Sequence, residues 1–174
     1  MSLHVGGGGG GTGTLNVQNG SALTLGYGSS FSLGVESGDI GTITVDGAGS
    51  SITGGNVFVG GGGTGALTVK NGGQTSALDL YVAYDTGSAG TVLVDGAGSV
   101  LNAGRADVGI SGNGKLILSN GGVANLESGE GTLYLGSEAD GVGALIIGGG
   151  SATAGTLNAA QVDGGSGTCA FIAE

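Results

Sequence analysis

Residues 41–49 read GTITVDGAG, and this stretch decides the fold because its pattern returns along the chain. The pattern is a glycine, two aliphatic residues at alternate positions and a glycine-rich turn. It occurs six times, at residues 13–20, 41–49, 65–73, 90–98, 114–122 and 143–150. Alternation of this kind is typical of a β-strand with one buried face. The copies, 24 to 29 residues apart, therefore predict six equivalent strands.

A second pattern, two aliphatic residues at alternate positions and usually a glycine, lies between the copies of the first. It occurs at residues 31–34, 57–60, 80–83, 106–109, 133–136 and 160–163, and a weaker third element is visible at 50–53 and 99–102. Each strand has only about two inward positions, so a core forms only when repeats stack and merge their inward positions into columns. We therefore predict an all-β fold, a parallel β-helix (solenoid) with about six coils of 23–29 residues.

Asn-Gly and Asp-Gly pairs follow the first strand of most repeats and suit tight corners. The same pairs are also typical of β-hairpins, which leaves an antiparallel meander as the alternative. Both repeat patterns keep their spacing over six copies, which a meander does not require, and we therefore favour the solenoid. The hexapeptide VDGAGS occurs at residues 45–50 and 94–99, two coils apart, which predicts that Lys70 lies between Asp46 and Asp95.

The repeats place the domain boundaries. We expect a leader or expression-derived Gly-rich segment at residues 1–10, one β-helical domain at 11–165, and a tail or the start of a further coil at 166–174.

Composition excludes several classes of function. The 174 residues include 46 Gly, no Pro, 13 acidic and three basic residues. Three scattered cations cannot form a nucleic-acid surface. Cys169 is the single cysteine, so this chain forms no internal disulfide. His4 is the single histidine, which excludes His-based triads and multi-His metal sites within it. We expect no catalytic residue, no cofactor and no metal.

The carboxylates are the remaining chemistry, because polysaccharide-cleaving enzymes use paired acids. The candidates are Asp79, Asp85, Asp107, Glu127, Glu130, Glu138 and Asp140. The alternative, which we favour, is that these are solvated loop acids that keep the rod soluble.

One column of side chains is a candidate interaction surface. The outward position of the second strand reads Ser32, Phe58, Tyr81, Asp107, Tyr134 and Gln161 from coil to coil. Phe58 and Tyr81 should therefore stack, and with Tyr134 they could bind a sugar ring or a partner protein. Ordinary stacking between coils that shields the backbone is the favoured alternative.

The repeats resemble those of autotransporter (type V secretion) passenger domains. GTLNVQNG (13–20), GALTVKNGG (65–73) and VFVG (57–60) carry this resemblance, which extends from about residue 11 to about residue 165. It implies a right-handed β-helical stalk, exported by a Gram-negative bacterium and displayed at or released from its outer membrane. We see no signal peptide and no membrane barrel here, so the resemblance implies a fragment joined to a C-terminal outer-membrane barrel.

The resemblance predicts a structural stalk segment, not an enzyme, that serves cell-surface display, adhesion or self-association, as in adhesins linked to virulence. The expected partners are a host-surface or other-cell protein or glycan, or a second copy of the chain. A polysaccharide-active β-helix, a lyase or hydrolase with clustered carboxylates, is the alternative.

Overall fold

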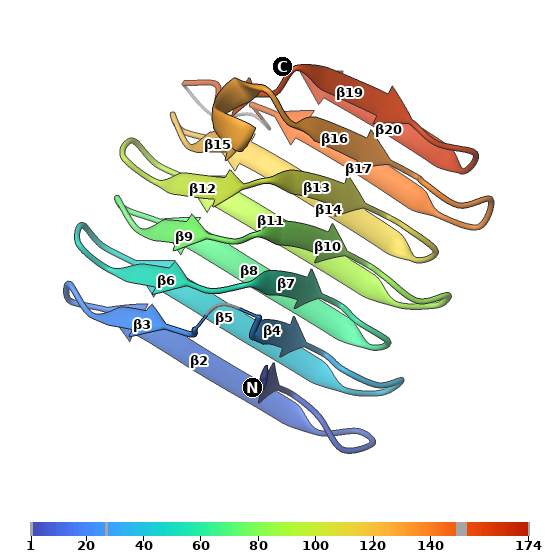
Figure 1. The fold of residues 1–174 in the computed structure, drawn as a ribbon, viewed down its shortest axis with the longest axis horizontal. Helices are drawn as coiled ribbons and strands as arrows, with labels where there is room; N and C mark the ends of the chain where they lie inside the picture. The colour runs from blue at the N-terminus through green and yellow to red at the C-terminus, as the bar shows by residue number, and fades with distance from the viewer. Residues whose placement is uncertain (1, 27, 149–152, 174) are drawn as a thin grey trace.

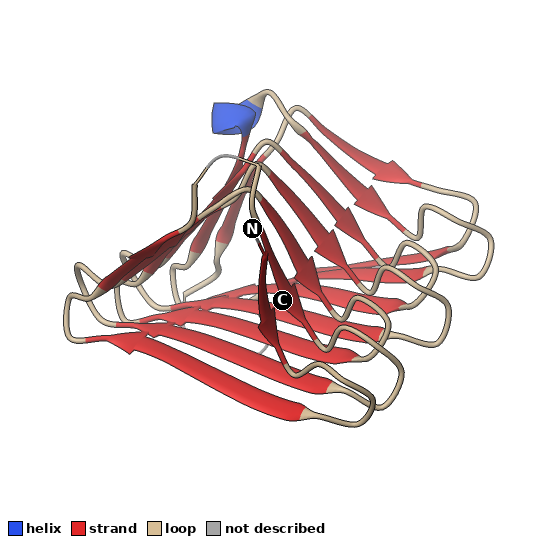
Figure 2. Ribbon diagram, turned by 60° about the horizontal axis from the view of Figure 1, so that its bottom comes forward, coloured by secondary structure: helices blue, strands red, loops and turns tan. Residues whose placement is uncertain are grey.

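The chain folds as a parallel β-solenoid of about six turns, as the all-β repeat pattern predicts (Figure 1). The structure is a computed structural model and describes residues 2–26, 28–148 and 153–173. Three parallel sheets run along the rod and meet at loop corners (Figure 2). Within the described ranges the only helical element is a short 3-10 turn, η1 (Glu127–Gly129), and no helix is long and apolar enough to cross a membrane.

Each coil contributes one strand to each sheet, except that the last coil has strands only in sheets A and B within the described residues. Sheet A contains β1 (Ser2–Val5), β4 (Ser30–Leu33), β7 (Asn56–Val59), β10 (Asp79–Val82), β13 (Arg105–Val108), β16 (Thr132–Leu135) and β19 (Gln161–Gly164). Sheet B contains β2 (Thr12–Gln18), β5 (Ile40–Asp46), β8 (Thr64–Lys70), β11 (Ala89–Asp95), β14 (Asn113–Ser119), β17 (Val142–Ile147) and β20 (Thr168–Ala173). Sheet C contains β3 (Ala22–Thr24), β6 (Ser51–Thr53), β9 (Gln74–Ser76), β12 (Val100–Ala103), β15 (Val123–Leu126) and β18 (Thr156–Asn158).

The core consists of columns of aliphatic side chains along the rod. In sheet B the in-register pairing places Ile43, Leu67, Val92, Leu116 and Leu145 above one another, and each is at most 2% exposed. The residues that alternate with these along each strand face outward and are less buried. The first repeat pattern therefore corresponds to sheet B, the second to sheet A and the third to sheet C.

Glycine opens the sheet B repeat in six of the seven coils, because sheets A and B meet closely at this position; Cys169 takes its place in β20. A Cβ atom on Gly65 would lie 2.1 Å from the backbone nitrogen of Gly60, and one on Gly90 would lie 2.2 Å from the carbonyl oxygen of Val59. Both distances are far below normal contact. The glycine of GTITV is thus required by the corner between the sheets.

The corner between sheets B and C has two alternating forms. Asn-Gly stands at residues 19–20, 71–72 and 120–121, and Asp-Gly-Ala-Gly-Ser stands at 46–50 and 95–99. The hydroxyl oxygen of buried Ser50 accepts a hydrogen bond from the N–H of Gly20 (3.1 Å), and Ser99 does the same for Gly72 (3.0 Å). Each VDGAGS copy therefore binds the Asn-Gly corner of the coil before it.

The second and third Asn-Gly corners in turn bind the VDGAGS copy that precedes them. The Asn71 amide donates to Asp46 (2.8 Å), and the Asn120 amide donates to Asp95 (2.7 Å). The 49-residue interval is thus a two-coil repeat of matched corners. The register also places Lys70 between Asp46 and Asp95, as predicted, and its ammonium lies 3.3 Å from Asp46. The hydrogen bond from Asn71, together with Lys70, lowers the pKa of Asp46 despite the opposing effect of burial.

Residues 1–10 were expected to precede the solenoid, but residues 2–10 contribute to its first coil. β1 pairs in register with β4, and the glycines that follow form a turn into β2. A carboxylate oxygen of Asp39 accepts hydrogen bonds from the N–H groups of Gly10 (2.7 Å) and Gly11 (2.8 Å). The glycine run at 6–11 is therefore part of the fold. Met1 lies outside the described residues.

The final coil differs from the expected register by two residues. Tyr134 pairs with Asp163, whereas Gln161 pairs with Thr132. The sequence pattern had aligned Val162 with Leu135, the second inward residue of β16. In the structure Val162 pairs instead with Leu133, the first inward residue, and Gly164 pairs with Leu135. The tail forms the next strand of sheet B, β20, in register with β17. Residues 149–150, which end the last repeat match, and Glu174 lie outside the described residues.

Candidate functional site

The outward face of sheet A carries a column of aromatic and charged side chains. The register aligns Phe58, Tyr81, Asp107 and Tyr134 on β7, β10, β13 and β16. The Phe58 and Tyr81 rings stack with centroids 5.0 Å apart and planes 19° apart, which confirms the predicted contact. The sequence therefore identified this pair correctly from strand parity and coil length.

Arg105 links the rings of Tyr81 and Tyr134, which lie on either side of Asp107 in this column. Its guanidinium carbon lies 5.6 Å from the centroid of Tyr81 and 5.5 Å from that of Tyr134. Both distances are typical of cation–π contacts. Arg105 also lies 3.4 Å from a carboxylate oxygen of Asp107. Phe58, Tyr81, Arg105 and Tyr134 thus form one connected column over four coils, which we call the sheet A column.

Asp107 is the buried acid of this face, with 7% of its surface exposed. Burial raises the pKa of its carboxyl, and the charge of Glu138 adds to this effect. A hydrogen bond donated by the Ser137 hydroxyl and the positive charge of Arg105 oppose the increase, but the pKa remains above its ordinary value. Asp107 is therefore not the solvated loop acid that we expected at this position.

Tyr84 is the most exposed ring of the group, at 43%, and lies just after β10. It makes edge contacts with Phe58 (centroids 5.5 Å apart) and Tyr81 (5.8 Å). The three rings also line a hollow. Its other lining residues are Asn56, Arg105, Asp107, Ile110, Ser137 and Glu138. We call this the aromatic hollow.

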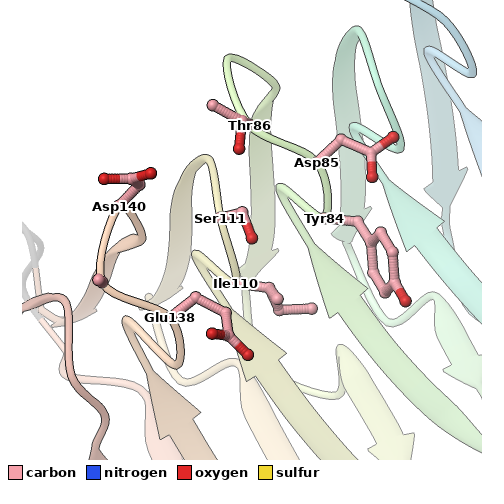
Figure 3. Close-up of a pocket in the computed structure, with 8 residues that line it drawn as sticks. Tyr84, Asp85, Thr86, Ile110, Ser111, Glu138 and Asp140 are labelled. Atoms are coloured by element: carbon pink, nitrogen blue, oxygen red, sulfur yellow. The ribbon is translucent and has the colours of Figure 1, made fainter.

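A second hollow adjoins the first at the turns that connect sheet A to sheet B. Its lining includes Asp85 on the turn after β10, Ser111 on the turn after β13 and Asp140 on the turn after β16 (Figure 3). Tyr84, Ile110 and Glu138 line both hollows. The two hollows therefore form one continuous concave surface along successive coils.

The structure brings some of the candidate acids together and separates others. Asp107 and Glu138 line the aromatic hollow, and Asp85, Glu138 and Asp140 line the second. Glu127 and Glu130 lie instead at η1, before β16, away from both linings. Asp79 accepts a hydrogen bond from the Tyr81 hydroxyl at 3.3 Å. Within the described ranges no group of three acidic, histidine or cysteine side chains could hold a metal ion.

Sequence reasoning missed Arg105 and Tyr84. Arg105 is two residues before Asp107 on the same strand, so strand parity places both side chains on the outer face and could have identified it. Tyr84 lies beyond the regular strand, where the two-residue period no longer predicts direction. Tyr134 was expected as a third ring of the surface, and it does join the column, through Arg105.

The chain is similar to the uncharacterized protein YuaQ of Escherichia coli K12. The two are 36% identical over 85 residues, which is 47% of this chain and 6% of the E. coli protein. The aligned segment thus spans a small part of that relative. No protein-family model matches the sequence, and no solved structure matches it.

Proposed function

We propose that this chain is a β-helical stalk segment of a bacterial autotransporter passenger, which serves surface display and adhesion. The observation that supports this proposal is the pairing pattern of the coils. Every strand in the described part of the chain pairs only with strands of adjacent coils, and the corners are joined by side-chain hydrogen bonds between adjacent coils. Each coil can therefore fold on the coil that has already formed, without waiting for distant segments.

Such stepwise folding suits a protein that is exported unfolded and folds outside the cell. The core needs no disulfide, because its stability comes from stacked aliphatic columns and paired strands. The net charge of −10 favours solubility and mutual repulsion of rods. The concave aromatic surface on sheet A supplies a place where an adhesive contact could form.

The proposal is tested by fusing residues 1–174 between a signal peptide and an outer-membrane autotransporter barrel in a Gram-negative host. We expect antibody labelling of the chain on intact cells, and a protease-resistant fragment of full solenoid size. A matched fusion that carries Leu67→Asp should be labelled weakly and digested completely, because it buries a charge in the core. Retention of the unmodified chain in the periplasm would contradict the proposal.

A polysaccharide-cleaving activity is the second candidate, and Asp107 is the observation that favours it. A carboxyl with a raised pKa beside another carboxylate is a common arrangement for a general acid. Release of reducing ends or of unsaturated products from neutral and acidic polysaccharides would test it. Activity that is lost in both Asp107→Asn and Glu138→Gln would favour the enzyme, and its absence would favour the stalk.

A further inference from the structure

We propose that two copies of this chain associate side by side through the outer face of sheet B, with their rods parallel. This inference goes beyond surface display and adhesion, and it concerns a different face of the rod from the aromatic hollow. Three features of sheet B support it: an apolar stripe, a lack of acidic side chains around the stripe, and a lysine and an aspartate on opposite sides of it.

The apolar stripe lies on the last four strands of sheet B, whose long strands form one side of the rod (Figure 2). In-register pairing aligns one outward side chain each from β11, β14, β17 and β20, namely Leu93, Ile117, Ile146 and Ile172. The first three are partly exposed, and Ile172 is 42% exposed. We call these four residues the sheet B stripe.

The same column is polar in the first three coils, where it reads Asn16, Thr44 and Thr68. Threonine suits a β-strand as well as isoleucine does, because both are branched at Cβ. The strand itself therefore does not require aliphatic residues at these outward positions. A contiguous apolar strip on an outer face, unlike a scattered apolar residue, indicates an interaction surface.

The charges around the stripe favour a second copy as its partner. The chain carries 13 acidic and three basic residues, so two copies repel each other on most approaches. Sheet A places Asp79, Asp107 and Asp163 on its outer face. The strands of sheet B contain only Asp46 and Asp95, each as the last residue of its strand. Two copies can therefore meet through sheet B with little repulsion.

Lys115 and Asp95 determine how the two copies are oriented. Lys115 is exposed two residues before Ile117 and makes no ion pair within the described part of the chain. Asp95 lies two residues after Leu93, in the preceding coil. A two-fold axis that runs along the rod over the stripe reverses the strands, so Lys115 of one copy faces the strand ends that carry Asp95 in the other.

This pair selects parallel rods. Antiparallel rods would place Lys115 opposite its own column, which contains no acid. An exposed ion pair contributes little to affinity, so most of the binding comes from the stripe.

The contact area predicts a dimer that dissociates on dilution. With the stripe at its centre, the contact covers seven strands about 4.8 Å apart and about five residues of each strand, or about 500 Å² on each copy. The total of about 1,000 Å² lies at the lower limit for specific interfaces. We therefore expect a weak dimer rather than a permanent one.

Sedimentation of the purified 174-residue chain, from micromolar to millimolar concentration, tests the proposal. We expect a monomer–dimer equilibrium that the double variant Leu93→Thr/Ile117→Thr weakens roughly tenfold or more, because apolar surface is lost from both copies. The variant should still fold, since Thr44 and Thr68 occupy the same column. Leu78→Thr, which removes an exposed apolar side chain just before β10, is the matched control and should dimerise normally.

A second variant and a change of salt sharpen the test. Thr68→Ile lengthens the stripe by one coil and should tighten the dimer several-fold. Salt screens the repulsion between two copies of net charge −10 but leaves apolar burial intact. Dimerisation should therefore strengthen between about 0.05 M and about 0.5 M sodium chloride.

Crosslinking tests the parallel arrangement. Leu93→Cys chains and Ile172→Cys chains, each in a Cys169→Ser background, should link to their own kind through a short bismaleimide, because the two-fold axis brings equal coils together. A mixture should give no crosslink between the two sites, which lie three coils apart. Predominance of the mixed crosslink would mean antiparallel rods and would overturn the arrangement.

The proposal is overturned if the chain stays monomeric at millimolar concentration, which would leave the stripe to a different protein. It is also overturned if the double variant dimerises as well as the unmodified chain, or if the dimer weakens as salt rises. Growth beyond a dimer that Phe171→Thr abolishes would assign association to the rod end instead, where Phe171 is 61% exposed.

Discussion

Asp39 joins two coils through a single buried carboxylate. It is 1% exposed and accepts hydrogen bonds from the backbone N–H groups of Gly10, Gly11 and, at 3.0 Å, Glu36. Burial raises the pKa of this carboxyl, but the backbone hydrogen bonds outweigh burial and lower the pKa below its ordinary value of 3.8. The ionised form is thus the one that the fold stabilises.

A lowered pKa gives the stability a defined dependence on pH. The contribution of Asp39 is fully present above the ordinary pKa and is lost as the pH falls through the lowered value. Asp39→Asn should therefore lower the melting temperature clearly at pH 7, because an amide accepts these bonds less well. The difference from the unmodified chain should shrink below pH 3.8. Circular dichroism melts between pH 7 and pH 2 measure it.

Asp140→Asn serves as the control for this substitution, because Asp140 is an exposed acid on the turn after β16. It should change the melting temperature little at any pH. Equal melting temperatures of Asp39→Asn and the unmodified chain at pH 7 would contradict the assigned role of Asp39.

At the scale of the element, the corner between sheets A and B depends on glycine. The Gly65→Ala substitution places a methyl group 2.1 Å from the nitrogen of Gly60 and 2.7 Å from the carbonyl carbon of Val59. Backbone must move to make room, so we expect a loss of about 3 kcal/mol of unfolding free energy, at the upper end of overpacking costs. Urea denaturation of the purified chain measures this loss.

Thr68→Ala is the matched control, because Thr68 lies on the same strand and is partly exposed on the outer face. Its effect should stay within about 0.5 kcal/mol. If Gly65→Ala costs no more than Thr68→Ala, then the close approach of the two sheets does not require glycine at this position.

The strands that were predictable from sequence are those with a strict two-residue period. Six of the seven strands of sheet B, all but β20, were identified because these long strands place aliphatic residues such as Ile43 and Val45 at fixed positions. The end of sheet A was misread because Gly164 fills an inward position that an aliphatic residue fills elsewhere. A two-residue pattern contains too little information to correct such a shift.

The corner bonds and the concave surface were less predictable. The bonds of Ser50 and Asn71 depend on the angle at which one corner faces the next, which spacing alone does not determine. The hollow depends on Tyr84, whose direction is set by a turn outside the regular strand. Local periodicity thus predicted the rod and its stacked rings, whereas the surface arose from contacts between coils.

At the scale of the whole molecule, the solenoid is a one-dimensional array in which each coil gains stability from its neighbours. The central strands β8, β11 and β14 have partners on both sides and fully buried inward residues. Within the described residues the inward positions of the last coil are poorly covered, and Phe171 on β20 is 61% exposed. Stability should therefore fall from the centre of the isolated chain toward both ends.

Amide hydrogen exchange of the 174-residue chain measures this gradient. We expect the slowest exchange in β8, β11 and β14 and the fastest in β1, β19 and β20, because end coils open without breaking the centre.

Leu67→Ala should cost about 2–5 kcal/mol of unfolding free energy, since Leu67 is 2% exposed. It should also speed exchange in β5, β8 and β11 together. Lys115→Ala, an exposed position on β14, should leave the pattern unchanged. Equal protection of central and terminal strands would instead mean that the rod unfolds as one unit, so that stability is not a sum over neighbouring coils.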